Sequence, residues 1–373
     1  MLPYIFTLLI LGSIYPQISP AKDSLSIYFA GDLMQHGPQI RFATNKEDGT
    51  FDYTECFEAV KEQISSADIA VGNLEVPLGG KPYSGYPQFS APDEYALAIK
   101  DAGFDLLITA NNHSLDRRKH GVERTIDMLD SLNILHVGTY KNDSLKSESY
   151  PLLVEKNNIK IAFLAYTYGT NGIEIQPPCK VNLIDREEIK KDVEKAKSMS
   201  PDVIIACMHW GTEYQHHPQQ AEKDLAKWML EQGVDHIIGS HPHVIQPIEV
   251  ITSPNDSTKR SVVAYSLGNF ISNQSKATTN RDNTDGGASV TLKLSKKYGK
   301  TELSDCYYSF NWVSRPQVSG NSNYKVYPAD YDTLKLNNSE RTLVEKFLKS
   351  ARKLYSNSNK GINEHIFIKK SAK

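Results

Sequence analysis

Residues 236–244 read His-Ile-Ile-Gly-Ser-His-Pro-His-Val, an apolar run that ends at a glycine and is followed by two histidines around a proline. A lone histidine is more often a satisfied polar residue than a metal ligand. Two imidazoles at positions i and i+2, in a backbone bent by Pro242, can instead face the same metal pair. His241 and His243 are therefore the first candidate ligands.

Four other short apolar runs also end at polar side chains that can bind metal: Gly31-Asp32, Gly72-Asn73-Leu74-Glu75, Asn111-Asn112-His113 and His209-Trp210-Gly211-Thr212-Glu213. A single aspartate or asparagine at a strand end is usually a turn or a helix cap. Five such clusters are hard to explain as caps, and ligands gather outside the carboxyl ends of strands in open α/β sheets. We expect one site to contain Asp32, Glu75, Asn112, His209, His241 and His243, with His36 near it. Mixed nitrogen and oxygen ligands suit Mn, Zn or Fe rather than Ca.

Strand-like and helix-like patterns alternate between these clusters, and antiparallel strand patterns follow them. This order predicts an α/β fold with mixed sheets. We find no repeat and no linker rich in Pro or Gly, so we expect one domain over residues 22–356 and a basic C-terminal tail over 357–373. A helix is expected over 55–64, a hairpin around Asn157-Asn158, a long polar loop over 273–287 and a last amphipathic helix over 341–355.

The N-terminus carries a targeting signal. Residues 4–15 form a mostly apolar run that is too short to span a bilayer comfortably but has the length of a signal-peptide core. Ser19-Pro20-Ala21 places small residues before Lys22. We predict a signal peptide over residues 1–21 and export to the periplasm, the cell surface or the medium. No Lys or Arg precedes the apolar run, so retention as an uncleaved membrane anchor stays open.

Composition excludes some classes of function. The formal net charge of −2 over 373 residues gives no electrostatic reason to expect a nucleic-acid partner. The four cysteines are widely spaced, without a CxxC pair, and do not predict a zinc knuckle. An exported protein could pair some of them, although Cys207, inside an apolar run, is better explained as a buried free thiol.

Taken in order, the motifs resemble the bacterial CapA family, which is associated with poly-γ-glutamate capsule synthesis and belongs to the calcineurin-like metallophosphoesterase superfamily. The resemblance covers about two-thirds of the chain and rests on Gly31-Asp32-Leu33-Met34, Asn73-Leu74-Glu75, Asn111-Asn112-His113 with Asp116, His209-Trp210-Gly211 with Glu213-Tyr214, Gly239-Ser240-His241-Pro242-His243-Val244 and Ser266-Leu267-Gly268-Asn269-Phe270. It implies a four-layer α/β/β/α sandwich with two mixed sheets and a dinuclear metal centre between the sheet ends.

The resemblance also implies roles for the ligands. Asp32 and His243 would hold one metal, a carboxylate would bridge, and the other metal would be held by Asn112, His209 and His241. The chain departs from the wider superfamily twice, with Met34 at a position that is usually His and Asn73 at one that is usually Asp. His36 is the expected replacement for the first, and Glu75 is the expected bridge.

His113 follows the expected ligand Asn112, so it is placed to donate a proton to a leaving group or to hold a phosphoryl oxygen. Asp116 could orient His113 through a hydrogen bond, or it could cap the helix expected to begin near Lys119. Glu213 is a candidate supporting carboxylate or substrate contact. Trp210 and Tyr214 are candidates for the pocket wall, with a core position as the alternative.

Two functions are compatible with these residues. The first is a hydrolase that uses a metal-activated water on a phosphoester, or on a γ-glutamyl or other cell-envelope polymer. The second is a non-catalytic accessory protein that handles or exports the polymer, with envelope capsule-synthesis proteins as partners.

Overall fold

The computed structural model describes residues 23–320 and 322–367. The predicted signal peptide and the end of the predicted tail, residues 368–373, lie outside this range, so the signal peptide stays a prediction. In the described ranges, no helix combines the length and the apolar character needed to cross a membrane.

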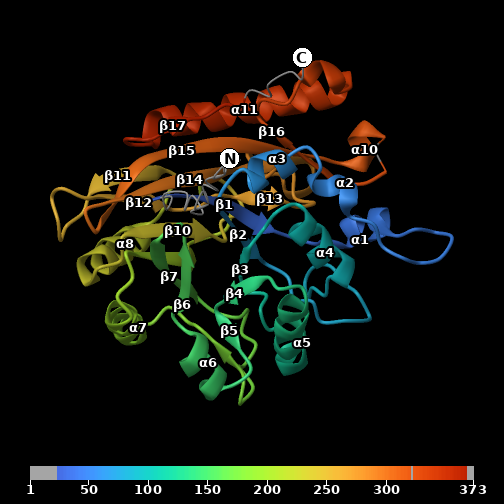
Figure 1. Cartoon of the computed structure of the whole chain (residues 1–373). Coiled ribbons are helices and arrows are strands. Elements are labelled where there is room, and N and C mark those ends of the chain that lie inside the picture. The colour runs from blue at the N-terminus through green and yellow to red at the C-terminus, as the bar shows by residue number, and fades with distance from the viewer. Residues whose placement is uncertain (1–22, 321, 368–373) are drawn as a thin grey trace, which may run out of the picture.

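Two large mixed sheets form the centre of the fold (Figure 1). The strands of the first sheet are β1 (Ser24–Leu33), β2 (Ile69–Leu74), β3 (Leu106–Ile108), β4 (Leu135–Val137), β13 (Asn269–Ile271), β14 (Gly286–Lys297), β15 (Lys300–Ser314), β16 (Lys325–Pro328) and β17 (Asn363–Glu364). Their order is β16-β15-β14-β1-β2-β3-β4, with β13 paired to β1 and β17 to β15. β1 to β4 are parallel to one another. β14 runs antiparallel to β1, β15 to β14 and β16 to β15.

The strands of the second sheet are β6 (Leu152–Lys156), β7 (Ile159–Thr167), β9 (Val203–His209), β10 (His236–Ser240), β11 (Ile248–Thr252) and β12 (Arg260–Ala264). Their order is β11-β12-β10-β9-β7-β6. The four inner strands are parallel, and the two edge strands pair antiparallel with their neighbours. A separate two-stranded sheet pairs β5 (Thr139–Tyr140) with β8 (Lys180–Val181).

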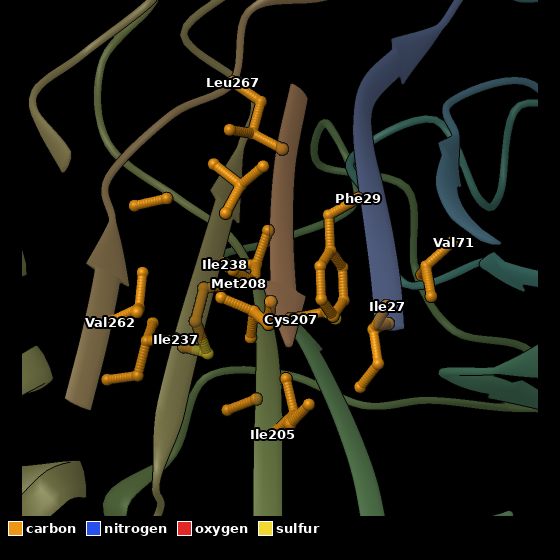
Figure 2. Close-up of a cluster of buried hydrophobic side chains, with 14 of the residues drawn as sticks. Ile27, Phe29, Val71, Ile205, Cys207, Met208, Ile237, Ile238, Val262 and Leu267 are labelled. Carbon is orange, nitrogen blue, oxygen red and sulfur yellow. The ribbon is translucent and has the colours of Figure 1, made fainter. Parts of the chain in front are cut away.

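The two sheets share a hydrophobic core (Figure 2). Ile27 and Phe29 of β1 point into it, where they belong to one cluster with Ile205 of β9 and Ile237 of β10. Side chains alternate between the faces of a strand, so Tyr28 belongs to a second cluster under the helices of the outer face. Burial of each large apolar side chain contributes about 1.5–3 kcal/mol, and this pattern holds the sheets face to face.

Helices cover the outer faces. α2 (Thr54–Phe57), α3 (Lys61–Ser65) and α4 (Asp93–Asp101) pack on the first sheet, and α7 (Arg186–Ser198) and α8 (Gln220–Gln232) pack on the second. α11 (Asn338–Ser358) instead packs on the inner face of the first sheet, where its Tyr355 contacts Tyr308 and Phe310 of β15. The remaining helices are α1 (Gly37–Ala43), α5 (Arg118–Ser131), α6 (Asp143–Ser149), α9 (Lys276–Thr279), α10 (Pro316–Ser319) and the 3-10 turn η1 (Thr333–Lys335). The predicted four-layer sandwich is confirmed.

Three boundaries differ from the prediction. The helix expected over 55–64 is two short helices, α2 and α3, although its apolar face is buried as expected. The loop expected over 273–287 contains α9. The domain does not end at residue 356, because α11 continues to Ser358, the amide of Lys360 donates to the carbonyl of Ile248, and β17 pairs with β15. The unpaired backbone N–H and C=O groups of a strand can pair with any extended segment that reaches them. Such pairing does not require apolar side chains, so a polar segment such as β17 is hard to predict from sequence.

Candidate metal centre

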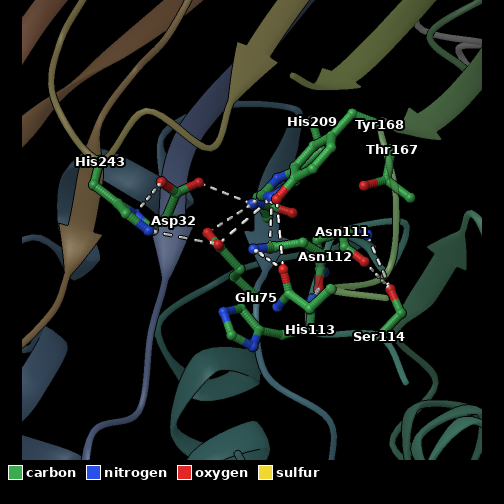
Figure 3. A network of polar contacts seen from close by, with 12 residues as sticks. Asp32, Glu75, Asn111, Asn112, His113, Ser114, Thr167, Tyr168, His209 and His243 are labelled. Carbon is green, nitrogen blue, oxygen red and sulfur yellow. Dashed lines mark hydrogen bonds and ion pairs between the residues drawn. The ribbon is translucent and has the colours of Figure 1, made fainter. Parts of the chain in front are cut away.

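The carboxyl ends of β1, β2, β3, β9 and β10 meet at one edge between the two sheets, and the polar clusters that follow these strands lie together there (Figure 3). The ring centroids of His209 and His241 are 4.8 Å apart. Six expected ligands are each at most 3% exposed: Asp32, Glu75, Asn112, His209, His241 and His243. Groups of this polarity are seldom buried without a partner.

Two sets of side chains in this cluster could each hold a metal ion. One contains Glu75, His209 and His241, the other contains Asp32, Glu75 and His243, and the ligand atoms within each set lie within 4.8 Å of one another. Glu75 belongs to both sets. Its Oε1 lies 3.5 Å from Nε2 of His209 and 3.8 Å from Nε2 of His243. The geometry therefore has the form of two adjacent sites that share one carboxylate.

Asn112 adds an oxygen to the first set. Its Oδ1 lies 2.9 Å from Nε2 of His209, and its Nδ2 donates to Oδ1 of Asn171 at 3.3 Å. Two donors bound to one ion at about 2 Å each lie roughly 3 Å apart. The spacing of Asn112 and His209 fits such a pair.

The donor atoms themselves fit a cation. Oε1 of Glu75 and Nδ1 of His241 are buried and have no hydrogen-bond partner among the residues that the structure describes. A buried polar atom left without a partner costs about 1–3 kcal/mol. A divalent ion accepts lone pairs from both kinds of atom, so coordination would remove this cost.

The electrostatics of the cluster are those of ionisable groups crowded together in a buried site. Burial, and next the neighbouring Asp32, raises the pKa of Glu75 well above its usual range. Burial, and next His241, lowers the pKa of His209 well below its usual range. Burial and the nearby His243 lower the pKa of His241 to about 3. His209 and His241 are thus held in the neutral form, which is the form that binds metal.

The backbone of the His-Pro-His segment is strained. The φ angles of His241 and His243 are +99° and +58°, a region that non-glycine residues seldom adopt. Each such residue costs about 1–3 kcal/mol and persists only where its surroundings hold it. The amide of Tyr214 donates to the carbonyl of Pro242 at 2.8 Å, and Nδ2 of Asn269 donates to the carbonyl of His243 at 3.2 Å. With this backbone conformation, both imidazoles belong to the metal-capable sets.

Glycines allow the close approach that builds the site. A Cβ on Gly239 would lie 2.0 Å from the carbonyl oxygen of Tyr265, and a Cβ on Gly31 would lie 1.9 Å from that of Gly268. Any side chain at either position would push the segment after β12 away from β1 and β10. Close packing of these segments therefore explains why glycine occupies position 31, next to Asp32, and position 239, two residues before His241.

His113 and Asp116 form a buried pair beside the cluster. Nδ1 of His113 lies 2.7 Å from Oδ2 of Asp116, which also accepts a hydrogen bond from the amide of Phe89 at 2.7 Å. A carboxylate can only accept, so Nδ1 carries the proton. α5 begins at Arg118 and has Arg117 as its N-cap residue. The capping alternative for Asp116 is therefore wrong, and its contact is with His113.

A cavity of about 250 Å³ opens next to the cluster. Its wall includes Met34, His36, Phe89, His113, Glu213, Tyr214 and His243. Glu213 is exposed at this cavity. Trp210 does not reach it, because its ring is buried and its Nε1 donates to the carbonyl of Tyr265 at 2.9 Å.

His36 lies on this wall and outside the cluster. Neither of the two metal-capable sets in the described part of the chain includes it. It is the N-cap residue of α1, and its Nδ1 lies 3.2 Å from Oε1 of Gln39. The amide of Asn273 also lies 3.4 Å from this Nδ1, so the ring nitrogen is engaged by its own surroundings.

Two residues of the site were not among the expected ligands or catalytic residues: Asn73, which the sequence placed only in a motif, and Tyr168, which it did not single out. Asn73 lies in its centre, where Nδ2 donates to Oδ1 of Asp32 at 2.8 Å and lies 3.3 Å from Nδ1 of His209. Tyr168 is 48% exposed, and its ring centroid lies 4.6 Å from that of His241. Tyr168 directly follows β7, which ends at the same edge as the five strands that carry the polar clusters. Its position after a strand end was the feature of the sequence that could have identified it.

Comparison with known proteins places this chain in a family. Residues 26–274 match the family model described as "Bacterial capsule synthesis protein PGA_cap". The chain is 29% identical to "Capsule biosynthesis protein CapA" of Bacillus anthracis over 69% of this chain and 63% of that protein. It is 30% identical to "PGA biosynthesis protein CapA" of Bacillus subtilis (strain 168) over 68% of this chain and 65% of that protein. The matches thus span less than two-thirds of either relative.

Among solved structures, the chain is similar to a calcineurin-like phosphoesterase, YfkN, of Bacillus subtilis. The TM-score is 0.42 and the sequence identity is 13%, over 90% of this chain and 98% of that one.

Proposed function

The chain belongs to the bacterial capsule synthesis family, with the CapA proteins as relatives, and we propose that it is a metal-dependent hydrolase acting on an acidic polymer of the cell envelope. The observation that carries the proposal is Glu75, which both metal-capable sets share. The bond to be cleaved is a γ-glutamyl amide or a phosphoester. The names of the relatives, which refer to capsule and PGA biosynthesis, support a polymer as substrate.

The proposed site would hold two divalent ions, Mn, Zn or Fe. Asp32 and His243 would hold one ion, Asn112, His209 and His241 the other, and Glu75 would bridge. When bound, such ions supply an acidified water and a positive charge for the oxygen of the scissile bond. The donor set is compatible with this assignment, because buried lone pairs of Glu75 and His241 have no hydrogen-bond partner among the described residues.

The chain's own residues would handle the proton of the leaving group. His113 faces the cavity while Asp116 holds its Nδ1–H at 2.7 Å. The other ring nitrogen is then free to hold or deliver a proton at the leaving group. Glu213, at the cavity wall, would contact the substrate.

One observation favours the accessory function. Asn73 stands at a position where the superfamily usually has an aspartate. Its Nδ2 donates a hydrogen bond to Oδ1 of Asp32 at 2.8 Å. A site with one carboxylate fewer binds metal less tightly, and it would suit a protein that holds the polymer without cleaving it.

Metal analysis of the purified protein, followed by a panel of γ-glutamyl and phosphodiester substrates, tests the proposal. His113→Ala should keep the wild-type metal content and lose turnover by about 10²–10⁴-fold, the usual contribution of a positioned acid. His241→Ala should lose metal and turnover together. His217→Ala, at an exposed histidine, is the matched control and should change neither. Normal metal binding by all variants, with no substrate cleaved by the wild type, would favour the accessory function.

We also propose that the protein is exported, on the sequence of residues 1–21 alone. N-terminal sequencing of the protein from its native host should find a mature chain that begins at Lys22. A chain that begins at Met1 in the cytosolic fraction would exclude this.

A further inference from the structure

A second cavity, of about 510 Å³, lies beside the one at the metal-ligand cluster. It is lined by residues 84–88 and by Asp116, Arg117 and Arg118. Tyr86 lines both cavities, and the buried pair joins them, since His113 lines the first and Asp116 the second. The two cavities are therefore adjacent at Tyr86 and at the His113–Asp116 pair.

Tyr86 divides the two cavities and is available for contact. Its side chain is 76% exposed, and its ring packs edge-on to that of Phe89 with the centroids 6.4 Å apart. The loop that carries it is closed by two backbone hydrogen bonds between Ser84 and Ser90, at 3.1 and 2.9 Å. The exposed aromatic ring is thus held in place on a fixed loop.

The second cavity has an excess of positive charge. Neither Arg117 nor Arg118 has an acidic partner within ion-pair distance in the described residues, whereas Arg124 is paired with Asp93. Nη1 of Arg117 donates to the carbonyl of Pro82 at 2.9 Å, which fixes that side chain without neutralising it. Arg118 is exposed and has a φ of +55°.

Asp116 is the one acidic residue among those that line this cavity, and its side chain is buried. Its Oδ2 contacts His113 and the amide of Phe89, and its Oδ1 has no hydrogen-bond partner among the described residues. Glu123, further along α5, lies 3.7 Å from Nζ of Lys119. The guanidinium groups are therefore the charges left to act on a ligand in this cavity, and guanidinium groups form strong charge-assisted hydrogen bonds to carboxylates and phosphates.

We propose that the second cavity is an anion subsite, in which Arg117 and Arg118 bind an acidic group on a polymer unit next to the one that reacts. The polymer lies across Tyr86, with its scissile bond at the metal-ligand cluster and its neighbouring unit at the arginines. The direction of the polymer rests on the proposed function, but binding of the acidic group requires no turnover.

Equilibrium binding tests the subsite separately from hydrolysis. The probes are fluorescently labelled short oligomers of γ-linked glutamate and of glycerol phosphate, with glutamate and inorganic phosphate as competitors that lack a second unit. Arg118→Gln should weaken oligomer binding about tenfold, the usual worth of a hydrogen bond to a charged group, and Arg117→Gln should do the same. The oligomer that loses more affinity identifies the acidic group as carboxylate or phosphate. Competition by the single units should weaken in the same variants, because each unit can place its own acidic group at the arginines.

The matched control is Arg186→Gln, on α7, where the guanidinium stacks over the ring of Trp228. Arg186 lines neither cavity, so this variant removes one positive charge without changing the proposed subsite. Oligomer binding should be unchanged. Thermal unfolding of each variant checks the fold. Since Arg117→Gln also removes the bond to Pro82, Arg118→Gln remains the decisive variant if Arg117→Gln is unstable.

Oligomer binding that is equal in wild type and Arg118→Gln would overturn the subsite. So would an equal loss in Arg186→Gln, because the effect would then be one of net charge. Failure of the proposed function would give a different result. The wild type would bind the oligomer and Arg118→Gln would bind it more weakly, but the wild type would contain no metal and would cleave no substrate.

Discussion

Asp116 holds Nδ1 of His113 at 2.7 Å, and both side chains are buried between the two cavities. The same carboxylate oxygen accepts a hydrogen bond from the amide of Phe89. This backbone contact fixes the carboxylate, and the carboxylate in turn orients the imidazole. Because Nδ1 is the donor, the reactive nitrogen of His113 is Nε2. The pair has the form of an oriented proton carrier beside a metal-ligand cluster.

The variant Asp116→Asn tests this orientation. Asparagine keeps the shape and can still accept through its oxygen, but it lacks the charge that stabilises an imidazolium. Turnover should fall about 10- to 100-fold, the usual effect of removing a partner that orients a site residue, while metal content and KM stay close to wild type. Steady-state kinetics with metal analysis measure both. Lost metal in Asp116→Asn would instead assign the pair to the metal site itself.

Glu75 and Asp32 should differ in their effect on metal stoichiometry. Glu75 belongs to both metal-capable sets, and Asp32 belongs to one. Glu75→Gln should weaken the binding of both ions, whereas Asp32→Asn should reduce the content toward one ion per chain. Titration with Mn or Zn followed by calorimetry distinguishes the two outcomes. Equal losses in both variants would contradict a shared carboxylate.

Asn73→Asp should make the protein more dependent on metal. The amide of Asn73 donates to Asp32 at 2.8 Å, and a third carboxylate there would face two other buried carboxylates, Asp32 and Glu75. The metal-free variant should unfold at a lower temperature than the metal-free wild type, because buried like charges repel. Added Mn or Zn should raise its Tm more than that of wild type. The same Tm shift in both proteins would mean that residue 73 does not face the ions.

Acid should destabilise the protein through His236, which lies at the start of β10, the strand that precedes the ligand candidates His241 and His243. Burial, and next Lys259, lowers the pKa of His236 from 6.5 to about 3. The ring is buried, and its Nδ1 accepts the amide of Val262 at 3.1 Å. The unfolded chain binds the proton first, so the free energy of unfolding falls as the pH drops from about 6.5 toward about 3. The loss at pH 5 is about 2 kcal/mol.

His236→Asn keeps an acceptor for the amide of Val262 but cannot take up a proton. The difference in the free energy of unfolding between pH 7 and pH 5 should therefore shrink by about 2 kcal/mol relative to wild type. Urea unfolding at the two pH values measures it. His120→Asn, at an exposed histidine of α5, is the control and should leave the difference unchanged. An unchanged difference in His236→Asn would show that other groups carry the acid sensitivity.

The sequence by itself determined the main features of the fold and most of the cluster. Apolar runs that end at Asp32, Asn112, His209 and His241 are strands by their length, and parallel strands bring their carboxyl ends to one edge. The apolar face of each helix follows from the same spacing rules. These features depend on residues that are close in the chain, so local patterns report them.

Only the tertiary structure decided how the side chains meet. Glu75 belongs to both metal-capable sets, Asn73 lies in their centre, Tyr168 covers His241, and His36 lies on the cavity wall. Each of these positions depends on a rotamer or on the distance between segments more than 30 residues apart in the chain. A difference of about one ångström in the packing of the two sheets decides whether two such side chains share an ion, and no pattern along a single strand carries that distance.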